Sequence, residues 1–131
     1  MGHRSFSATF AVAVICLFGG VTVGTASAAP KPIATYCSPT GDYCQGIFRQ
    51  SGGLRAKISS FAFSGRYEIC LTNRTYGRQC NRFRLRKDSL GIYQGSVGLA
   101  KQFRFQAKGR YMVVWRLSGS RVGKKLSFRK R

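Results

Sequence analysis

Three carboxylates and one histidine are the side chains of this 131-residue chain that suit general acid–base catalysis. The carboxylates are Asp42, Glu68 and Asp88, and the histidine is His3. A glycosidase of the usual kind needs two facing carboxylates, and a nuclease needs a histidine or a metal ion held by carboxylates. We therefore predict that the protein is not an enzyme and uses no cofactor, with a secreted hydrolase as the less favoured alternative.

Four cysteines form a second reactive group. Cys37, Cys44, Cys70 and Cys80 are an even number downstream of a candidate export signal, which predicts two disulfides. Of the three ways to pair them, we predict Cys37–Cys44 and Cys70–Cys80, because each closes a short loop that contains turn residues. A zinc site is disfavoured, since six and nine intervening residues do not match C-x₂₋₄-C clips and no histidine accompanies them.

Side-chain alternation tests the second pairing. In a strand, alternate residues face opposite sides of the sheet. In segments 66–71 and 80–87, the residues predicted to face the core are Tyr67, Ile69, Leu71, Asn81, Phe83 and Leu85. Both Cys70 and Cys80 then face outward. Pairing residue 70 with residue 80 in antiparallel strands sets Glu68 opposite Arg82, so we predict a cross-strand ion pair there.

The basic side chains point to an anionic partner. The chain has 23 Lys and Arg against 3 Asp and Glu, a formal net charge of +20. Arg82, Arg84 and Arg86 alternate along one predicted strand, about 6.6 Å apart on one face, and Lys87 follows. Arginine binds phosphate with paired hydrogen bonds, so this row suits a phosphate polymer. The alternative is a solvated face whose charges prevent association between sheet edges.

A second basic group lies near the C-terminus. We predict that it assists anion binding, and its members are Lys124, Lys125, Arg129 and Lys130. Recognition of nucleic acid usually adds exposed aromatic rings on which bases stack. Most aromatic residues here occupy strand positions that face the predicted core, and Tyr76 is the best candidate for an exposed ring. We therefore predict no specific nucleic-acid readout, and no metal site.

The N-terminal segment is typical of an export signal. Residues 1–7 carry Arg4, residues 8–23 are almost continuously apolar, and Ala26-Ser27-Ala28 supplies small residues for a signal peptidase. The apolar run is shorter than the ~20 residues that a membrane-spanning helix needs. We predict a signal peptide at 1–28 and one secreted domain at 29–131, without a transmembrane anchor after processing. That domain keeps 22 basic and 3 acidic side chains, a net charge of +19.

Alternation of apolar and polar residues predicts the fold class. Residues 54–58, 93–99 and 110–117 alternate as strands do, and helical periodicity is absent. With 43–50, 66–71, 80–87 and 122–130 they make about seven strands, which predicts an all-β, two-sheet sandwich. Residues 29–35 contain two prolines and are expected to be an extended lead. Residues 100–108 are expected to be either a strand or an ordered crossing between sheets.

The segment Gly109-Arg110-Tyr111, followed by Met112-Val113-Val114-Trp115-Arg116-Leu117, resembles the penultimate strand of immunoglobulin-like domains. The resemblance implies that the tyrosine hydroxyl bonds to upstream backbone. The final hairpin is also similar to that of immunoglobulin-like copper-resistance proteins of bacterial envelopes. Those proteins bind copper through histidine and methionine, whereas residues 29–131 offer only Met112, so the resemblance carries over the fold and not the metal.

Taken as a whole, the mature chain resembles small uncharacterised secreted proteins of actinobacteria. The resemblance rests on the leader, the loop from Tyr36 to Cys44, Ile47-Phe48-Arg49, Glu68-Ile69-Cys70-Leu71 and the closing Tyr-x-Val-x-Trp-Arg-Leu strand. It implies secretion and an all-β fold, and it implies no activity. Association with the cell wall is an expectation from the basic charge.

We expect a non-catalytic, exported, cationic domain that binds an anionic cell-envelope polymer or an acidic lipid surface. The alternative is a secreted effector directed at proteins, either a protease inhibitor or a cationic antimicrobial. For an inhibitor, the disulfide-braced loop 73–78 would be the bait.

Overall fold

The computed structural model describes residue 24 and residues 28–131. The predicted signal peptide at 1–28 therefore lies almost entirely outside the described residues. In the part of the chain that the structure describes, no helix is long and apolar enough to cross a bilayer.

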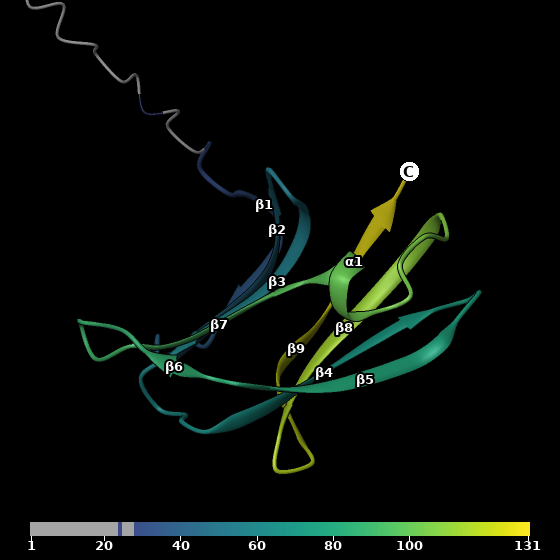
Figure 1. Ribbon diagram of the computed structural model, residues 1–131. Helices are drawn as coiled ribbons and strands as arrows, with labels where there is room; N and C mark the ends of the chain where they lie inside the picture. The colour runs from purple at the N-terminus through teal and green to yellow at the C-terminus, as the bar shows by residue number, and fades with distance from the viewer. Residues whose placement is uncertain (1–23, 25–27) are drawn as a thin grey trace, which may run out of the picture.

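Two antiparallel β-sheets pack face to face and form a sandwich (Figure 1). The five-stranded sheet has the order β1 (Lys31–Cys37), β2 (Tyr43–Gln50), β3 (Gly53–Ser60), β7 (Tyr93–Gly98) and β6 (Arg86–Lys87). The four-stranded sheet has the order β5 (Gly77–Arg84), β4 (Arg66–Asn73), β8 (Gly109–Leu117) and β9 (Ser120–Lys130). A single short helix among the described residues, α1 (Leu99–Gln102), follows β7. The predicted all-β, two-sheet sandwich is confirmed.

The described residues form nine strands rather than the seven expected, for two reasons. The segment expected to be an extended lead contains β1, which pairs with β2 as an edge strand. Pro32 is tolerated there because an edge strand leaves one side of its backbone unpaired, and the register shifts between Pro32 and Ala34. The expected strand 80–87 divides at Leu85 into β5 and β6, which belong to different sheets.

The core lies between the two sheets and contains most of the side chains that alternation assigned to it. Asn81 is the exception, because it is exposed and its amide bonds to the Gln102 carbonyl of the crossing segment. Tyr67, Ile69 and Leu71 are buried, as are Tyr111 and Trp115 on the neighbouring strand β8. The rings of Tyr111 and Phe128 stack with centroids 5.6 Å apart. Large aromatic side chains contribute much of the apolar area that such a small core can bury.

Residues 99–108 are an ordered crossing between the sheets, not a strand. Two residues of this segment, Phe103 and Phe105, bury their side chains in the core. Its backbone is held by β5: the Asn81 amide donates to the Gln102 carbonyl, and the Gln79 side chain bonds both the N–H and the carbonyl of Arg104. The Tyr111 hydroxyl donates to the Ala107 carbonyl at 2.8 Å. That bond is the one implied by the resemblance to immunoglobulin-like domains.

Both predicted disulfides are present, and each joins residues directly opposite each other in a hairpin. Cys37 pairs with Cys44 and Cys70 with Cys80, with Cα–Cα distances of 4.0 and 4.1 Å. Glu68 lies opposite Arg82, and their charged groups are 3.6 Å apart, which confirms the predicted ion pair. Cys70 faces outward as predicted but is buried, because β4 is a central strand and Arg78 lies 3.5 Å from the sulfur.

Stability should fall at high pH because Tyr67 is buried. Burial raises the pKa of Tyr67 to about 12, against about 10 in an unfolded chain. Between these values the unfolded chain has lost the phenolic proton and the folded chain retains it, so unfolding is increasingly favoured as pH rises. We expect a loss of about 2–3 kcal/mol between pH 10 and 12. Urea titrations over this range should show a shallower decline for Tyr67→Phe; an identical slope would contradict the assignment.

Candidate functional site

The predicted row of three arginines is not a single row in the structure. Arg82 and Arg84 lie on the outer face of β5, in the four-stranded sheet. Leu85 then turns into the core and donates its N–H to the Gly65 carbonyl, so the chain leaves one sheet and enters the other. Arg86 and Lys87 follow on β6, at the edge of the five-stranded sheet. The predicted alternation holds up to Arg84, but the crossover separates Arg86 from the row.

The C-terminal basic group also divides. The Lys124 ammonium lies 5.3 Å from the centre of the Tyr36 ring, and Lys130 binds the Phe105 and Gln106 carbonyls. These two lysines are engaged in cation–π contacts and hydrogen bonds within the fold. Lys125 and Arg129 are exposed and alternate with buried Leu126 and Phe128, so they face outward from β9.

The tertiary structure brings Arg82, Arg84, Lys125 and Arg129 together with basic residues that the sequence analysis did not single out. All lie on the outer face of the four-stranded sheet, at positions alternating with core residues. We call this surface the basic face, and its members are Arg66, Arg78, Arg82, Arg84, Arg110, Arg116, Arg121, Lys125 and Arg129. Glu68 is the one carboxylate on it.

Several arginines of the basic face stand directly opposite one another across strand pairs. Arg66 pairs with Arg84 between β4 and β5, while Arg116 pairs with Arg121 and Arg110 with Arg129 between β8 and β9. Cross-strand partners have Cβ atoms only about 4.5–5.5 Å apart, and like charges at such positions destabilise a sheet. A fold selected for stability alone would place opposite charges there.

Glu68 lies between two arginines in one row across the sheet. It is the cross-strand partner of Arg82 on β5 and of Arg116 on β8, and the row continues to Arg121. The surface here is a depression of about 300 Å³ whose lining includes Arg66, Arg82 and Arg116. The Arg82 side chain is 77% exposed and Glu68 is 26% exposed, so the guanidinium remains accessible to a ligand.

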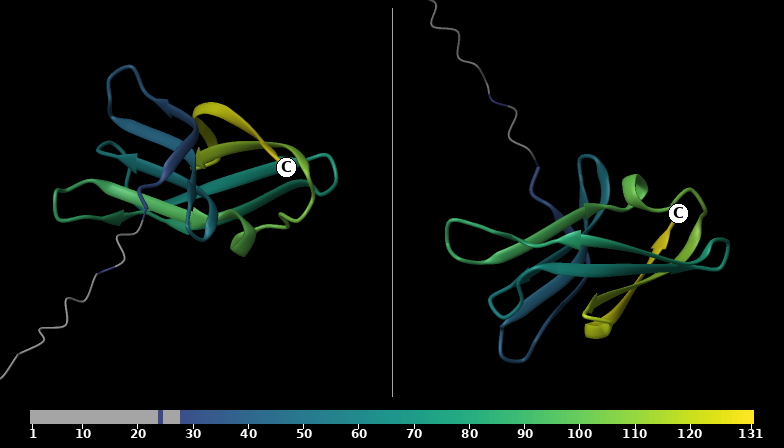
Figure 2. Two further views of the ribbon diagram at one scale, coloured as in Figure 1. Left: turned by 90° about the horizontal axis from the view of Figure 1, so that it is seen from above. Right: turned by 60° about the horizontal axis from the view of Figure 1, so that its bottom comes forward.

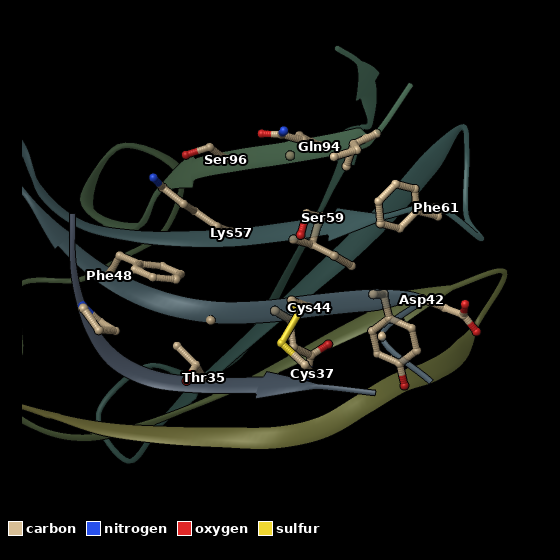
Figure 3. A pocket seen from close by; sticks show the side chains of 18 residues that line it. Thr35, Cys37, Asp42, Cys44, Phe48, Lys57, Ser59, Phe61, Gln94 and Ser96 are labelled. Atoms are coloured by element: carbon tan, nitrogen blue, oxygen red, sulfur yellow. A yellow bond between two sulfur atoms is a disulfide. The ribbon is translucent and has the colours of Figure 1, made fainter. Parts of the chain in front are cut away.

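The opposite sheet carries a larger pocket on its own outer face (Figure 3). It has a volume of about 650 Å³, and its lining includes the Cys37–Cys44 disulfide, Phe48 and Phe61. In Figure 3, Phe61 and Asp42 lie at one end and Phe48 at the other, with the disulfide between them. A β-carbon at Gly46 would come within 2.8 Å of the Phe48 ring, so glycine leaves room for that ring on the strand. No pattern in the sequence indicates this pocket.

The three carboxylates have structural partners on separate elements. Asp42 accepts a hydrogen bond from Thr40 in the β1–β2 turn, Glu68 faces Arg82, and Asp88 holds the turn between β6 and β7. Among the described residues, the one grouping of metal-ligand types is Glu68, Cys70 and Cys80. Its two sulfurs are bonded to each other, so the grouping offers a single carboxylate.

Tyr76 differs from its predicted role as an exposed ring. It is half-buried, and its hydroxyl accepts the Ala107 N–H at 3.2 Å and lies 3.4 Å from the Gln106 side chain. Tyr76 therefore fastens the β4–β5 hairpin to the crossing segment, and the ring is not a free platform for stacking bases. The loop 73–78 is the tight turn of this hairpin, with the Thr75 N–H bonded to Asn73.

Part of the basic face was within reach of sequence reasoning. The predicted pairing of residues 70 and 80 also sets Arg66 opposite Arg84 when the register is extended by four positions. Arg110 and Arg116 share the outward parity next to Tyr111 and Trp115. The pairing of β4 with β8, which joins the two hairpins into one surface, carries no local signal.

Comparison with known proteins gives no match to a protein-family model, a curated protein or a solved structure. The fold and the site therefore define the protein by its class: a disulfide-braced antiparallel β-sandwich with an arginine-rich face on one sheet.

Proposed function

We propose that the protein is an exported, non-catalytic domain that binds phosphate-rich anionic polymers of the cell envelope through the basic face. The observation that carries the proposal is the set of directly opposed arginine pairs, Arg66–Arg84, Arg116–Arg121 and Arg110–Arg129. Export is supported by the N-terminal sequence pattern and by two disulfides, which persist in oxidising compartments.

The geometry of the basic face suits a flexible polymer better than a single small anion. Neighbouring strands lie about 4.8 Å apart, and alternate residues along a strand are about 6.6 Å apart. Guanidinium groups on this grid reach successive phosphates of a chain that crosses all four strands. An anionic polymer also removes the repulsion between opposed arginines, so binding relieves a cost that the free protein carries.

Solubility alone does not account for the basic face. A net charge of magnitude about 2–8 is sufficient for a small domain, and residues 29–131 carry +19. Protection of sheet edges requires charges on β5 and β9, the edge strands of the four-stranded sheet. Arg66, Arg110 and Arg116 lie on the central strands β4 and β8, where edge protection has no role.

The decisive test replaces one arginine of each opposed pair: Arg84→Glu, Arg121→Glu and Arg129→Glu together. Each replacement converts a like-charge pair into an opposite-charge pair, so thermal stability should be maintained or should rise. Affinity for isolated wall teichoic acid should fall at least about a hundredfold at moderate salt, and the slope of log K against log salt should decrease by about three. Isothermal titration across a salt series measures both quantities.

The matched control changes the net charge equally, away from the basic face: Lys31→Glu, Lys101→Glu and Arg104→Glu. These residues are exposed and lie on β1, α1 and the crossing segment. Screening limits distant charges to a small effect at moderate salt, so affinity should change by less than about fivefold. If both triple variants lost the same affinity, binding would depend on overall charge alone, and the basic face would be rejected as a site.

A further inference from the structure

Three turns gather at one end of the five-stranded sheet. Ser60, the last residue of β3, pairs with Tyr43 on β2 and with Tyr93 on β7. Consequently the turns 38–42, 61–65 and 88–92 leave the sheet at the same end. Figures 1 and 2 show the β6–β7 turn projecting on the side where β3 connects to β4. We call the turns 61–65 and 88–92, with their flanking basic residues, the loop end.

The loop end exposes large apolar side chains. Leu90 is 81% exposed and Phe61 is 65% exposed, the highest values for large hydrophobic residues in the described chain. The two turns are adjacent, because Ser60, which precedes Phe61, pairs with Tyr93, which follows Ile92. A single exposed apolar residue is ordinary, whereas two on neighbouring turns at one end of a sheet point to a surface that meets an apolar phase.

Backbone donors around these side chains are already bonded within the protein. The Asp88 carboxylate accepts the N–H groups of Leu90 and Ile92, each at 2.9 Å. In the other turn, the Phe61 N–H donates to the Asp42 carbonyl, and Ser60 Oγ accepts the next two N–H groups at 2.9 and 2.8 Å. A polar group that enters an apolar phase without a partner is strongly penalised. These turns avoid that penalty at the N–H groups nearest the exposed side chains.

Basic side chains flank the apolar tips. Arg86 and Lys87 are exposed and immediately precede the turn at 88–92, and Arg66 is exposed and immediately follows the turn at 61–65. The nearby carboxylates are already bonded, Asp42 by Thr40 and Asp88 by Gln94 and backbone N–H groups. This arrangement matches an anionic bilayer. Its negative headgroups lie outside its acyl chains, so apolar residues at the tip would reach the acyl chains while the basic residues behind them meet the headgroups.

We propose that the loop end docks on an anionic lipid bilayer, with Leu90 and Phe61 entering the boundary between headgroups and acyl chains. Arg86 and Arg66 contact the headgroups, and Lys87 adds its positive charge from above the Tyr93 ring, 5.7 Å from the ring centre. This site differs from the basic face in its chemistry because it adds an apolar contribution that salt does not screen. Arg66 belongs to both sites, so it is the apolar, salt-resistant part of lipid binding that fails independently of polymer binding.

The test measures co-sedimentation of the mature chain, residues 29–131, with vesicles of equal parts phosphatidylglycerol and phosphatidylcholine. The double variant Leu90→Ser/Phe61→Ser should lose about tenfold or more of its partitioning, with most of the binding that survives at high salt removed. The control is Ile33→Ser, which alters the other exposed large apolar residue, 40% exposed on β1. It should partition as the unaltered chain does. Circular dichroism melts verify that all three proteins are folded.

Insertion itself is read from Leu90→Trp. The native Trp115 is fully buried, so a change in tryptophan emission on adding vesicles reports the new side chain. We expect a blue shift and quenching by brominated acyl chains. Unchanged emission, equal partitioning of Leu90→Ser/Phe61→Ser, or failure of the unaltered chain to bind vesicles would each overturn the proposal. The triple arginine replacement on the basic face should leave the blue shift intact.

Discussion

Replacing Gly95 with alanine is expected to lower the free energy of unfolding by about 3 kcal/mol, the upper end of the usual cost of overpacking a core. Gly95 lies on β7, and a β-carbon there would come within 2.6 Å of Tyr67 Cζ and 2.7 Å of Tyr67 Cε1. Tyr67 belongs to the other sheet, is 2% exposed and packs against Phe83, so its ring has little room to move. The contact therefore sets how closely the two sheets approach.

Thermal denaturation provides the measurement, with a decrease in Tm of about 15 °C expected for a domain of this size. Gly98→Ala is the matched control on the same strand, because a β-carbon there meets its nearest neighbours at 3.6 and 3.7 Å, which is ordinary contact. Its effect should stay within about 0.5 kcal/mol. If both variants lost similar stability, the cost would come from replacing glycine in the strand backbone, and the role of Tyr67 would be refuted.

Removing the Cys70–Cys80 disulfide with Cys70→Ser/Cys80→Ser is expected to cost about 3–4 kcal/mol. Part of the loss, about 3 kcal/mol, comes from the larger conformational freedom of the unfolded chain once the loop is open. The remainder arises because Cys70 is 2% exposed, so a serine hydroxyl there is buried in place of sulfur. Chemical denaturation of both proteins gives the difference directly.

The Cys37–Cys44 bridge supplies the comparison. It closes a shorter loop, with a sequence separation of 7 against 10, and Cys37 is exposed at the edge strand β1. Cys37→Ser/Cys44→Ser should therefore cost about 2 kcal/mol. The ranking is the informative result, because a larger loss from the edge bridge would mean that burial of Cys70 does not govern the difference.

The hairpins illustrate what local sequence can predict. Tyr67, Ile69 and Leu71 alternate with polar residues, and two cysteines ten residues apart flank a turn, so the register of β4 and β5 follows from adjacent segments. The Glu68–Arg82 ion pair then follows from counting positions. By contrast, basic and apolar residues alternate without interruption from Arg82 through Leu85 to Arg86. Nothing in this alternation marks Leu85 as the point where the chain passes from one sheet to the other.

The sequence by itself determined that alternating strands braced by two disulfides would form an all-β sandwich, because these features depend on neighbours along the chain. Only the tertiary structure decided which basic residues share a surface. The pairing of β4 with β8 joins residues far apart in sequence, and it places Arg66, Arg82 and Arg84 beside Arg110, Arg116 and Arg121. Such a pairing is selected by how both sheets close over one core, a condition that involves the whole chain at once.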